Sequence, residues 1–120
     1  MAKRDLFGAV DFDRLQAYAG GDAALVEEVL GLFEEQAQIW MRLLEAAGEG
    51  ARDAAHTLKG AALGIGADDL ARACGVAEQE ADPALLPRRA GQVRDALDAA
   101  CADIAAYRHA MLLQALKPSR

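Results

Sequence analysis

Only two histidines occur in the 120-residue sequence, and His56 lies among residues that suit a particular chemistry. Lys59 and Gly60 follow it by three and four positions, so both lie beside the imidazole if the segment is helical. A glycine inside a helix costs about 1 kcal/mol relative to alanine, so in an alanine-rich chain it suggests a need for open space. An imidazole with a neighbouring ammonium group and an open side suits a site that accepts a phosphoryl group.

A helix is needed to hold these side chains on one face, and the sequence predicts that helix over about residues 51–64. The glycines of the segment Gly64-Ile65-Gly66 would end it, because glycine readily adopts the left-handed conformation of a helix cap. The opposite side of the predicted helix carries the apolar residues that would face a core. These are Ala55, Leu58, Ala62 and Ile65.

Apolar residues at helical spacing predict four more helices around this one. The first is a short helix over 11–19 with Asp11 as its N-cap, and the second is a long helix from the cap Asp22 to Gly48. The third runs from Asp68 or Asp69 to about Ala81. The last has roughly 28 residues, with Pro87 in its first turn. The stripe of the long helix is broad enough to contact more than one neighbour. It consists of Leu25, Val26, Val29, Leu30, Leu32, Phe33, Ala37, Trp40 and Leu44.

No alternating run of β-branched residues predicts a strand. The predicted fold class is therefore all-α, an antiparallel four-helix bundle with a short extra N-terminal helix. We expect a single domain over residues 1–120 and, because one chain supplies a complete bundle, a monomer.

Composition and charge exclude several classes of protein. Hydrophobic residues make up 53% and charged residues 27%, which is a globular composition. A net charge of −6 argues against nucleic-acid binding, and no run approaches the ~20 apolar residues of a membrane span. Met1 to Asp5 lead into no apolar signal region, so we expect a cytoplasmic protein. The cysteines Cys74 and Cys101 are interpreted as small buried apolar side chains rather than as a disulfide.

The segment from His56 to Leu70, HTLKGAALGIGADDL, resembles the signature of the histidine-containing phosphotransfer (HPt) family. That signature is similar to His-Thr-Leu-Lys-Gly and small residues, then Leu-Gly-Ala and an apolar residue three positions on. The resemblance extends into the next helix at Cys74 and Glu78, and the order and lengths of the helices match over nearly the whole chain. Leu63 and Gly64 replace a smaller and a polar residue often found there, a departure that bears on which partner docks.

The resemblance implies a phosphocarrier of a two-component phosphorelay, without kinase activity of its own. Nε2 of His56 would exchange a phosphoryl group with receiver-domain aspartates, Lys59 would offset the phosphoryl charge, and Gly60 would leave room for the receiver. By analogy with the family, Glu78 would accept a hydrogen bond from Nδ1–H. Response-regulator receiver domains and a sensor or hybrid histidine kinase are the implied partners. The chain is expected to need no cofactor of its own, and the receiver would supply Mg²⁺.

The same residues also fit other interpretations. His56 can be a helix-surface histidine without a role, and Glu78 an ordinary surface charge. A carboxylate-bridged metal bundle needs paired Glu-x-x-His motifs, whereas Asp53-x-x-His56 stands alone. The second histidine, His109, has no comparable neighbours and is interpreted as structural or exposed. The strongest alternative function is a helical adaptor that binds partners without transferring phosphate.

Overall fold

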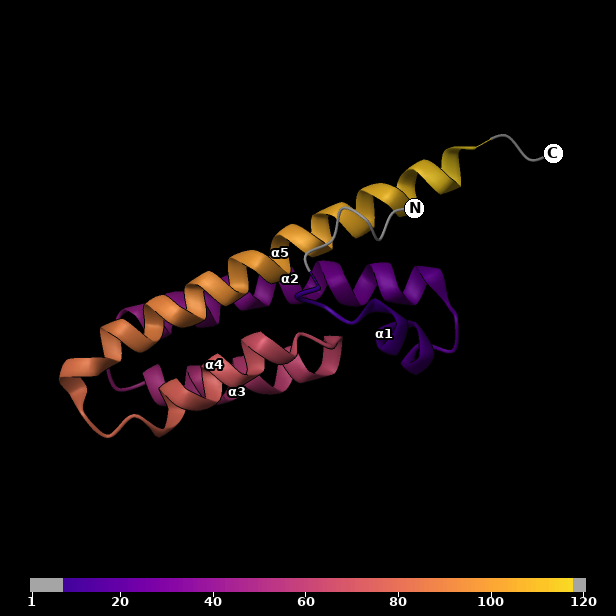
Figure 1. Ribbon diagram of the computed structural model, residues 1–120. Helices are drawn as coiled ribbons and strands as arrows, with labels where there is room; N and C mark the ends of the chain where they lie inside the picture. Colours follow the sequence, from indigo (N-terminus) through magenta and orange to yellow (C-terminus); the bar gives the residue numbers. More distant parts are fainter. Residues whose placement is uncertain (1–7, 118–120) are drawn as a thin grey trace.

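The computed structural model describes residues 8–117 as an all-helical fold (Figure 1). Its elements are α1 (Phe12–Tyr18), α2 (Ala23–Glu45), α3 (Ala51–Ile65), α4 (Asp68–Gln79), the 3₁₀ helix η2 (Pro83–Leu85) and α5 (Leu86–Leu116). The predicted all-α class is confirmed. α4 ends two residues before the predicted Ala81, and α5 has 31 residues rather than roughly 28. The single domain over 1–120 stays a prediction, because residues 1–7 and 118–120 lie outside the described part.

The capping residues predicted from the sequence lie at the helix ends in the structure. Asp11 and Asp22 are the N-caps of α1 and α2, and each side chain accepts a hydrogen bond from a backbone N–H three residues later, at 3.1 Å. Gly66 follows α3 with a φ of 84°, in the left-handed region. A Cβ at Gly66 would lie only 2.8 Å from the carbonyl oxygen of Asp11, so the close approach of α1 to the end of α3 also requires glycine.

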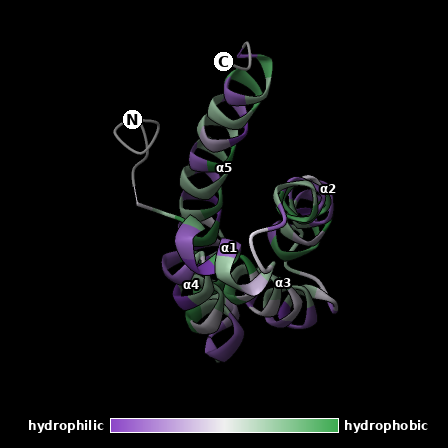
Figure 2. Ribbon diagram, turned by 90° about the vertical axis from the view of Figure 1, so that its right-hand side faces the viewer, coloured by the Kyte–Doolittle hydropathy of each residue, from purple (hydrophilic) through white to green (hydrophobic). Residues whose placement is uncertain are grey.

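Helices α2, α3, α4 and α5 form the bundle. Each packs against the next, α5 packs against α2, and consecutive helices run in opposite directions (Figure 1). The short connections between them force this antiparallel course. Viewed from the end in Figure 2, α5 extends well past the other helices toward its C-terminus. None of the helices in residues 8–117 is long and apolar enough to cross a membrane.

Apolar side chains from all four bundle helices fill the core. The largest fully buried ones are Leu30, Met41, Leu44, Leu58, Leu70, Leu97 and Ile104. The stripe predicted on α2 is only partly core, because Leu32 is 57% exposed and Leu25 is exposed as well. The residues at the edge of this stripe, including the half-buried Val29 and Trp40, lie outside the part of the α2 surface that the neighbouring helices cover. They leave an apolar strip on the surface of α2 beside α3.

The short helix α1 closes one end of the bundle. Phe12 stacks on Tyr107 of α5 with ring centroids 4.1 Å apart, and Gln16 donates a hydrogen bond to the Tyr107 hydroxyl. The backbone N–H of Asp11 donates to the Gly66 carbonyl at 2.9 Å. These contacts hold the end of α3 in place and leave the middle of α3, which carries His56, clear of α1.

Candidate functional site

His56 lies near the middle of α3, on the side turned away from the core, and its side chain is 68% exposed. The opposite side of the same helix is buried, with Ala55, Leu58 and Ala62 fully enclosed. Burying that side fixes the rotation of α3 about its axis. The exposure of His56 is therefore a direct consequence of the apolar pattern of α3.

Glu78 of α4 holds the inner edge of the imidazole. Its Oε2 atom lies 2.7 Å from Nδ1 of His56, and its side chain is only 16% exposed. The other carboxylate oxygen, Oε1, is buried and lies 3.1 Å from Nζ of Lys59. One carboxylate of α4 thus pairs with two residues of α3. The sequence-derived candidates His56, Lys59 and Glu78 form a single cluster, although the pairing of Lys59 with Glu78 was not predicted.

The charge of Glu78 determines which nitrogen of His56 carries the proton. The Lys59 ammonium group, followed by the His56 ring, holds the pKa of Glu78 below its ordinary value, although partial burial raises it. The carboxylate is therefore ionised at neutral pH and can only accept hydrogen bonds. A neutral imidazole beside it must carry its proton on Nδ1, which leaves the lone pair on Nε2. Because Nε2 is on the far edge of the ring, it points away from Glu78.

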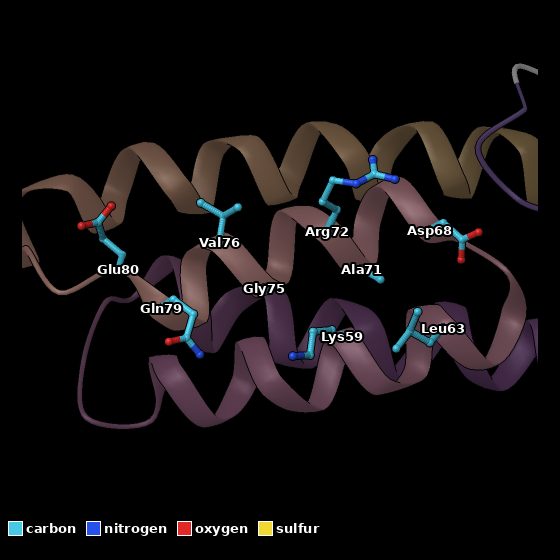
Figure 3. Close-up of a pocket in the computed structure, with 9 residues that line it drawn as sticks. All are labelled: Lys59, Leu63, Asp68, Ala71, Arg72, Gly75, Val76, Gln79 and Glu80. Carbon is cyan, nitrogen blue, oxygen red and sulfur yellow. The ribbon is translucent and has the colours of Figure 1, made fainter.

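Lys59 runs along α4 rather than out into solvent. Its side chain is 33% exposed, and its stem passes close to Gly75, where an added Cβ would lie 3.7 Å from Cδ. A groove of about 880 Å³ lies between the two helices (Figure 3). Its lining includes Lys59 and Leu63 of α3 and Arg72 and Val76 of α4. Lys59 therefore both pairs with Glu78 and lines this groove.

Gly60 provides the open side that the sequence predicted. A Cβ built on Gly60 would meet nothing within 4 Å, and the same holds for Gly64 one turn later. Beyond Gly64, the surface becomes an apolar hollow of about 270 Å³ between α2 and α3, which Leu32 and Trp40 help to line. The face around His56 therefore combines open glycine backbone with exposed apolar side chains.

One contact near His56 could not be foreseen from local spacing. Arg52, one turn before His56 on α3, donates from Nη1 to the carbonyl of Glu78 at 2.7 Å and from Nη2 to the carbonyl of Glu80 at 3.2 Å. The only signal in the sequence is the four-residue spacing from Arg52 to His56, which places both on the same face of α3. Spacing alone does not reveal that the end of α4 lies opposite that face.

The cysteines do not join the site. Cys74 is fully buried, and burial, followed by the charge of Glu78, raises the pKa of its thiol to about 12. Burial likewise raises the pKa of the partly buried Cys101 to about 11. Both thiols are thus protonated at neutral pH and poor nucleophiles. Within residues 8–117, no group of three or more His, Cys, Asp or Glu side chains is placed to hold a metal ion.

Comparison with known proteins identifies the family. The sequence model of the Hpt domain matches residues 23–103, which include α3, α4 and the His56 cluster. The chain belongs to the Hpt domain family. Hpt domains of two-component phosphorelays are phosphocarriers rather than kinases, and they interact with histidine kinases and receiver domains. This chain is accordingly a phosphotransfer protein of a two-component phosphorelay.

A solved structure supports the same assignment. The histidine phosphotransferase ShpA from Caulobacter crescentus is 47% identical to this Hpt chain, and the two superpose with a TM-score of 0.79. The match covers 92% of this chain and 100% of ShpA. Among curated protein sequences, none matches this chain. The family predicted from the segment His56–Leu70 is therefore confirmed.

Proposed function

We propose that His56 is the residue that carries the phosphoryl group, through its Nε2 atom. The observation that carries this proposal is the contact of 2.7 Å between Nδ1 of a 68% exposed imidazole and the Glu78 carboxylate. That contact selects the tautomer in which Nε2 holds the lone pair. The second histidine, His109, is also exposed on the surface, but no carboxylate within residues 8–117 contacts its ring.

The transfer step follows from this arrangement. The Nε2 lone pair attacks the phosphorus of a receiver's aspartyl phosphate, the bond between phosphorus and the aspartyl oxygen breaks, and the aspartate leaves as a carboxylate. Because Nδ1 keeps its proton, the phosphorylated ring becomes cationic. The Glu78 carboxylate, 2.7 Å away, offsets this positive charge as it develops. The reverse attack by the aspartate returns the group.

Lys59 is proposed to stabilise the phosphoryl oxygens. In the unphosphorylated protein its ammonium group lies 3.1 Å from Oε1 of Glu78, one helical turn from His56. When the phosphoryl group arrives, the flexible lysine side chain extends from the groove to share its charge between Glu78 and the phosphoryl oxygens. The Mg²⁺ that neutralises the remaining charge comes with the receiver domain, and the chain needs no cofactor of its own.

The receiver domain docks over the open side of α3 in this proposal. Gly60 and Gly64 let its active-site edge approach His56, and the apolar strip with Leu32 and Trp40 buries apolar surface of the receiver. Response-regulator receiver domains and a sensor or hybrid histidine kinase are the partners. The chain acts as a monomer in the cytoplasm and makes no phosphohistidine from ATP on its own.

Transfer of radioactive phosphate tests this proposal. We expect wild-type protein mixed with a phosphorylated receiver to gain label that is labile in acid and stable in base, as a phosphoramidate bond is. His56→Gln should gain no label, whereas the control His109→Gln should label at the wild-type rate. Equal labelling of wild type and His56→Gln would refute the role of His56. A wild type that binds the receiver without gaining label would favour the helical adaptor instead.

A further inference from the structure

The C-terminal end of α4 is held by a residue of α3 that lies one turn before His56. The last four carbonyl groups of an α-helix have no partner within the helix, and they carry the negative end of its dipole. At the end of α4, the guanidinium group of Arg52 donates to the carbonyl of Glu78 at 2.7 Å and to that of Glu80 at 3.2 Å. A planar fork with several fixed donors suits such a pair of carbonyls.

This contact and the contact of His56 meet on the same residue. Arg52 binds the backbone of Glu78, and His56 binds its side chain at 2.7 Å. Both come from one face of α3, four residues apart. The position of the Glu78 main chain relative to α3 is thereby fixed on the same turn of helix that carries the imidazole.

A separate contact holds the end of α4 to α5. Nε of Arg89 lies 2.8 Å from Oε1 of Glu80, so the chain after α4 remains tied to α5 without Arg52. The two arginines therefore have different consequences. Arg89 anchors the chain after α4 to the bundle without contacting Glu78, whereas Arg52 sets the distance between Glu78 and the helix that carries His56.

We infer that Arg52 is a positioning residue for phosphoryl transfer, because it aligns Glu78 and thereby selects the tautomer of His56. The inference rests on the proposed roles of His56 and Glu78. Without Arg52, the end of α4 shifts relative to α3, and the contact between Glu78 and Nδ1 lengthens. A smaller fraction of the imidazole then carries its proton on Nδ1, and fewer molecules present the Nε2 lone pair.

Nitrogen NMR of the His56 ring, at a pH about two units above the ordinary imidazole pKa, measures the tautomer directly. We expect wild type to show the Nδ1–H form and Arg52→Gln to show a mixture of both tautomers. The initial transfer rate of Arg52→Gln should fall about threefold to tenfold, which is less than the roughly 10- to 100-fold loss on removing a direct partner of a histidine, because Arg52 acts through Glu78. Arg52→Lys, which keeps one donor, should give intermediate values.

Arg89→Gln is the matched control. It should lower the melting temperature without changing the tautomer of His56 or the transfer rate. The inference is overturned if Arg52→Gln and Arg52→Lys, checked for folding by circular dichroism, both keep the wild-type tautomer and rate. It is also overturned if Arg89→Gln shifts the tautomer as much as Arg52→Gln does. If the wild type orients its ring but gains no label, and Arg52→Gln loses that orientation, the proposed function is contradicted while the alignment of Glu78 by Arg52 is supported.

Discussion

Charged side chains join α2 to α5 and also join α3 to α4. The two sets of contacts differ in whether a reactive side-chain atom is left free. Arg94 of α5 meets both oxygens of Glu45 at 2.9 and 3.0 Å. Arg108 donates to both Glu27 and Glu34 on α2. The N–H donors of each guanidinium group are occupied by these hydrogen bonds, so the pairs serve only to hold α5 against α2.

Between α3 and α4, one carboxylate serves two partners of different kinds. Glu78 accepts the hydrogen bond of His56 Nδ1–H with one oxygen and pairs with the Lys59 ammonium group through the other. The imidazole still has a nucleophilic nitrogen. The lysine ammonium group can also interact with an arriving anion. A histidine hydrogen-bonded across two helices therefore keeps a reactive ring edge, whereas an arginine in the same setting does not.

The largest effect should come from closing the open side of α3. Gly60→Leu places a branched side chain where nothing lies within 4 Å, so the protein folds but the receiver cannot approach His56. A misplacement of about 1 Å between reacting groups can cost about 100-fold, so we expect at least that loss in transfer rate. Gly91 of α5 also faces open space, and Gly91→Leu should transfer at the wild-type rate. Equal rates for Gly60→Leu and wild type would show that access over Gly60 is not needed.

Removing the charge of Lys59 should have the next largest effect. Lys59→Met keeps the apolar stem over Gly75 but offers no charge to the phosphoryl oxygens. We expect the transfer rate to fall on the order of 10- to 100-fold. This loss is smaller than that for a fully buried donor, because Lys59 is partly exposed. Lys59→Arg should recover most of the rate. Stopped-flow measurements of receiver dephosphorylation would test this, and an unchanged rate in Lys59→Met would assign Lys59 to the pairing with Glu78 alone.

Glu78→Gln should slow transfer about tenfold, because an amide can both donate and accept and does not select one tautomer. It should also change how stability depends on pH. Lys59 and His56 lower the pKa of Glu78 in the folded state from its ordinary 4.5, so the stabilisation is complete above that value and is lost as pH falls through the lowered pKa. The difference in unfolding free energy between wild type and Glu78→Gln should therefore be constant above about pH 5 and shrink below 4.5. A difference that instead grows on acidification would contradict the assigned contacts.

The smallest effect on transfer should come from the contacts between α2 and α5. Arg108→Met removes the pairs with Glu27 and Glu34 and should lower the free energy of unfolding by about 1 kcal/mol, since these pairs are only partly buried. The transfer rate should not change. Urea unfolding and the transfer assay on the same sample would separate the two readouts, and a slowed transfer would show that this region communicates with His56.

Sequence reasoning succeeded where the determinants are local. The caps Asp11 and Asp22, the left-handed Gly66 and the shared face of His56, Lys59 and Gly60 all depend on spacing within a few residues. Glu78 lies 22 residues from His56, so its pairing came only from resemblance to the family.

Contacts between helices were beyond the reach of local spacing. Arg52 binds carbonyls 26 and 28 residues away, and Lys59 binds a carboxylate on another helix, so both contacts depend on how α3 and α4 pack. The exposure of Leu32 depends in the same way on how much of α2 its neighbours cover. An apolar stripe indicates which side of a helix avoids water, but not how wide the covering surface is.

Phosphorus and nitrogen NMR of the phosphorylated protein would show which atom holds the phosphoryl group. We expect coupling of phosphorus to Nε2 of His56, with the proton retained on Nδ1 beside Glu78. Phosphorus bound to Nδ1 of His56, or to another side chain such as His109, would contradict it.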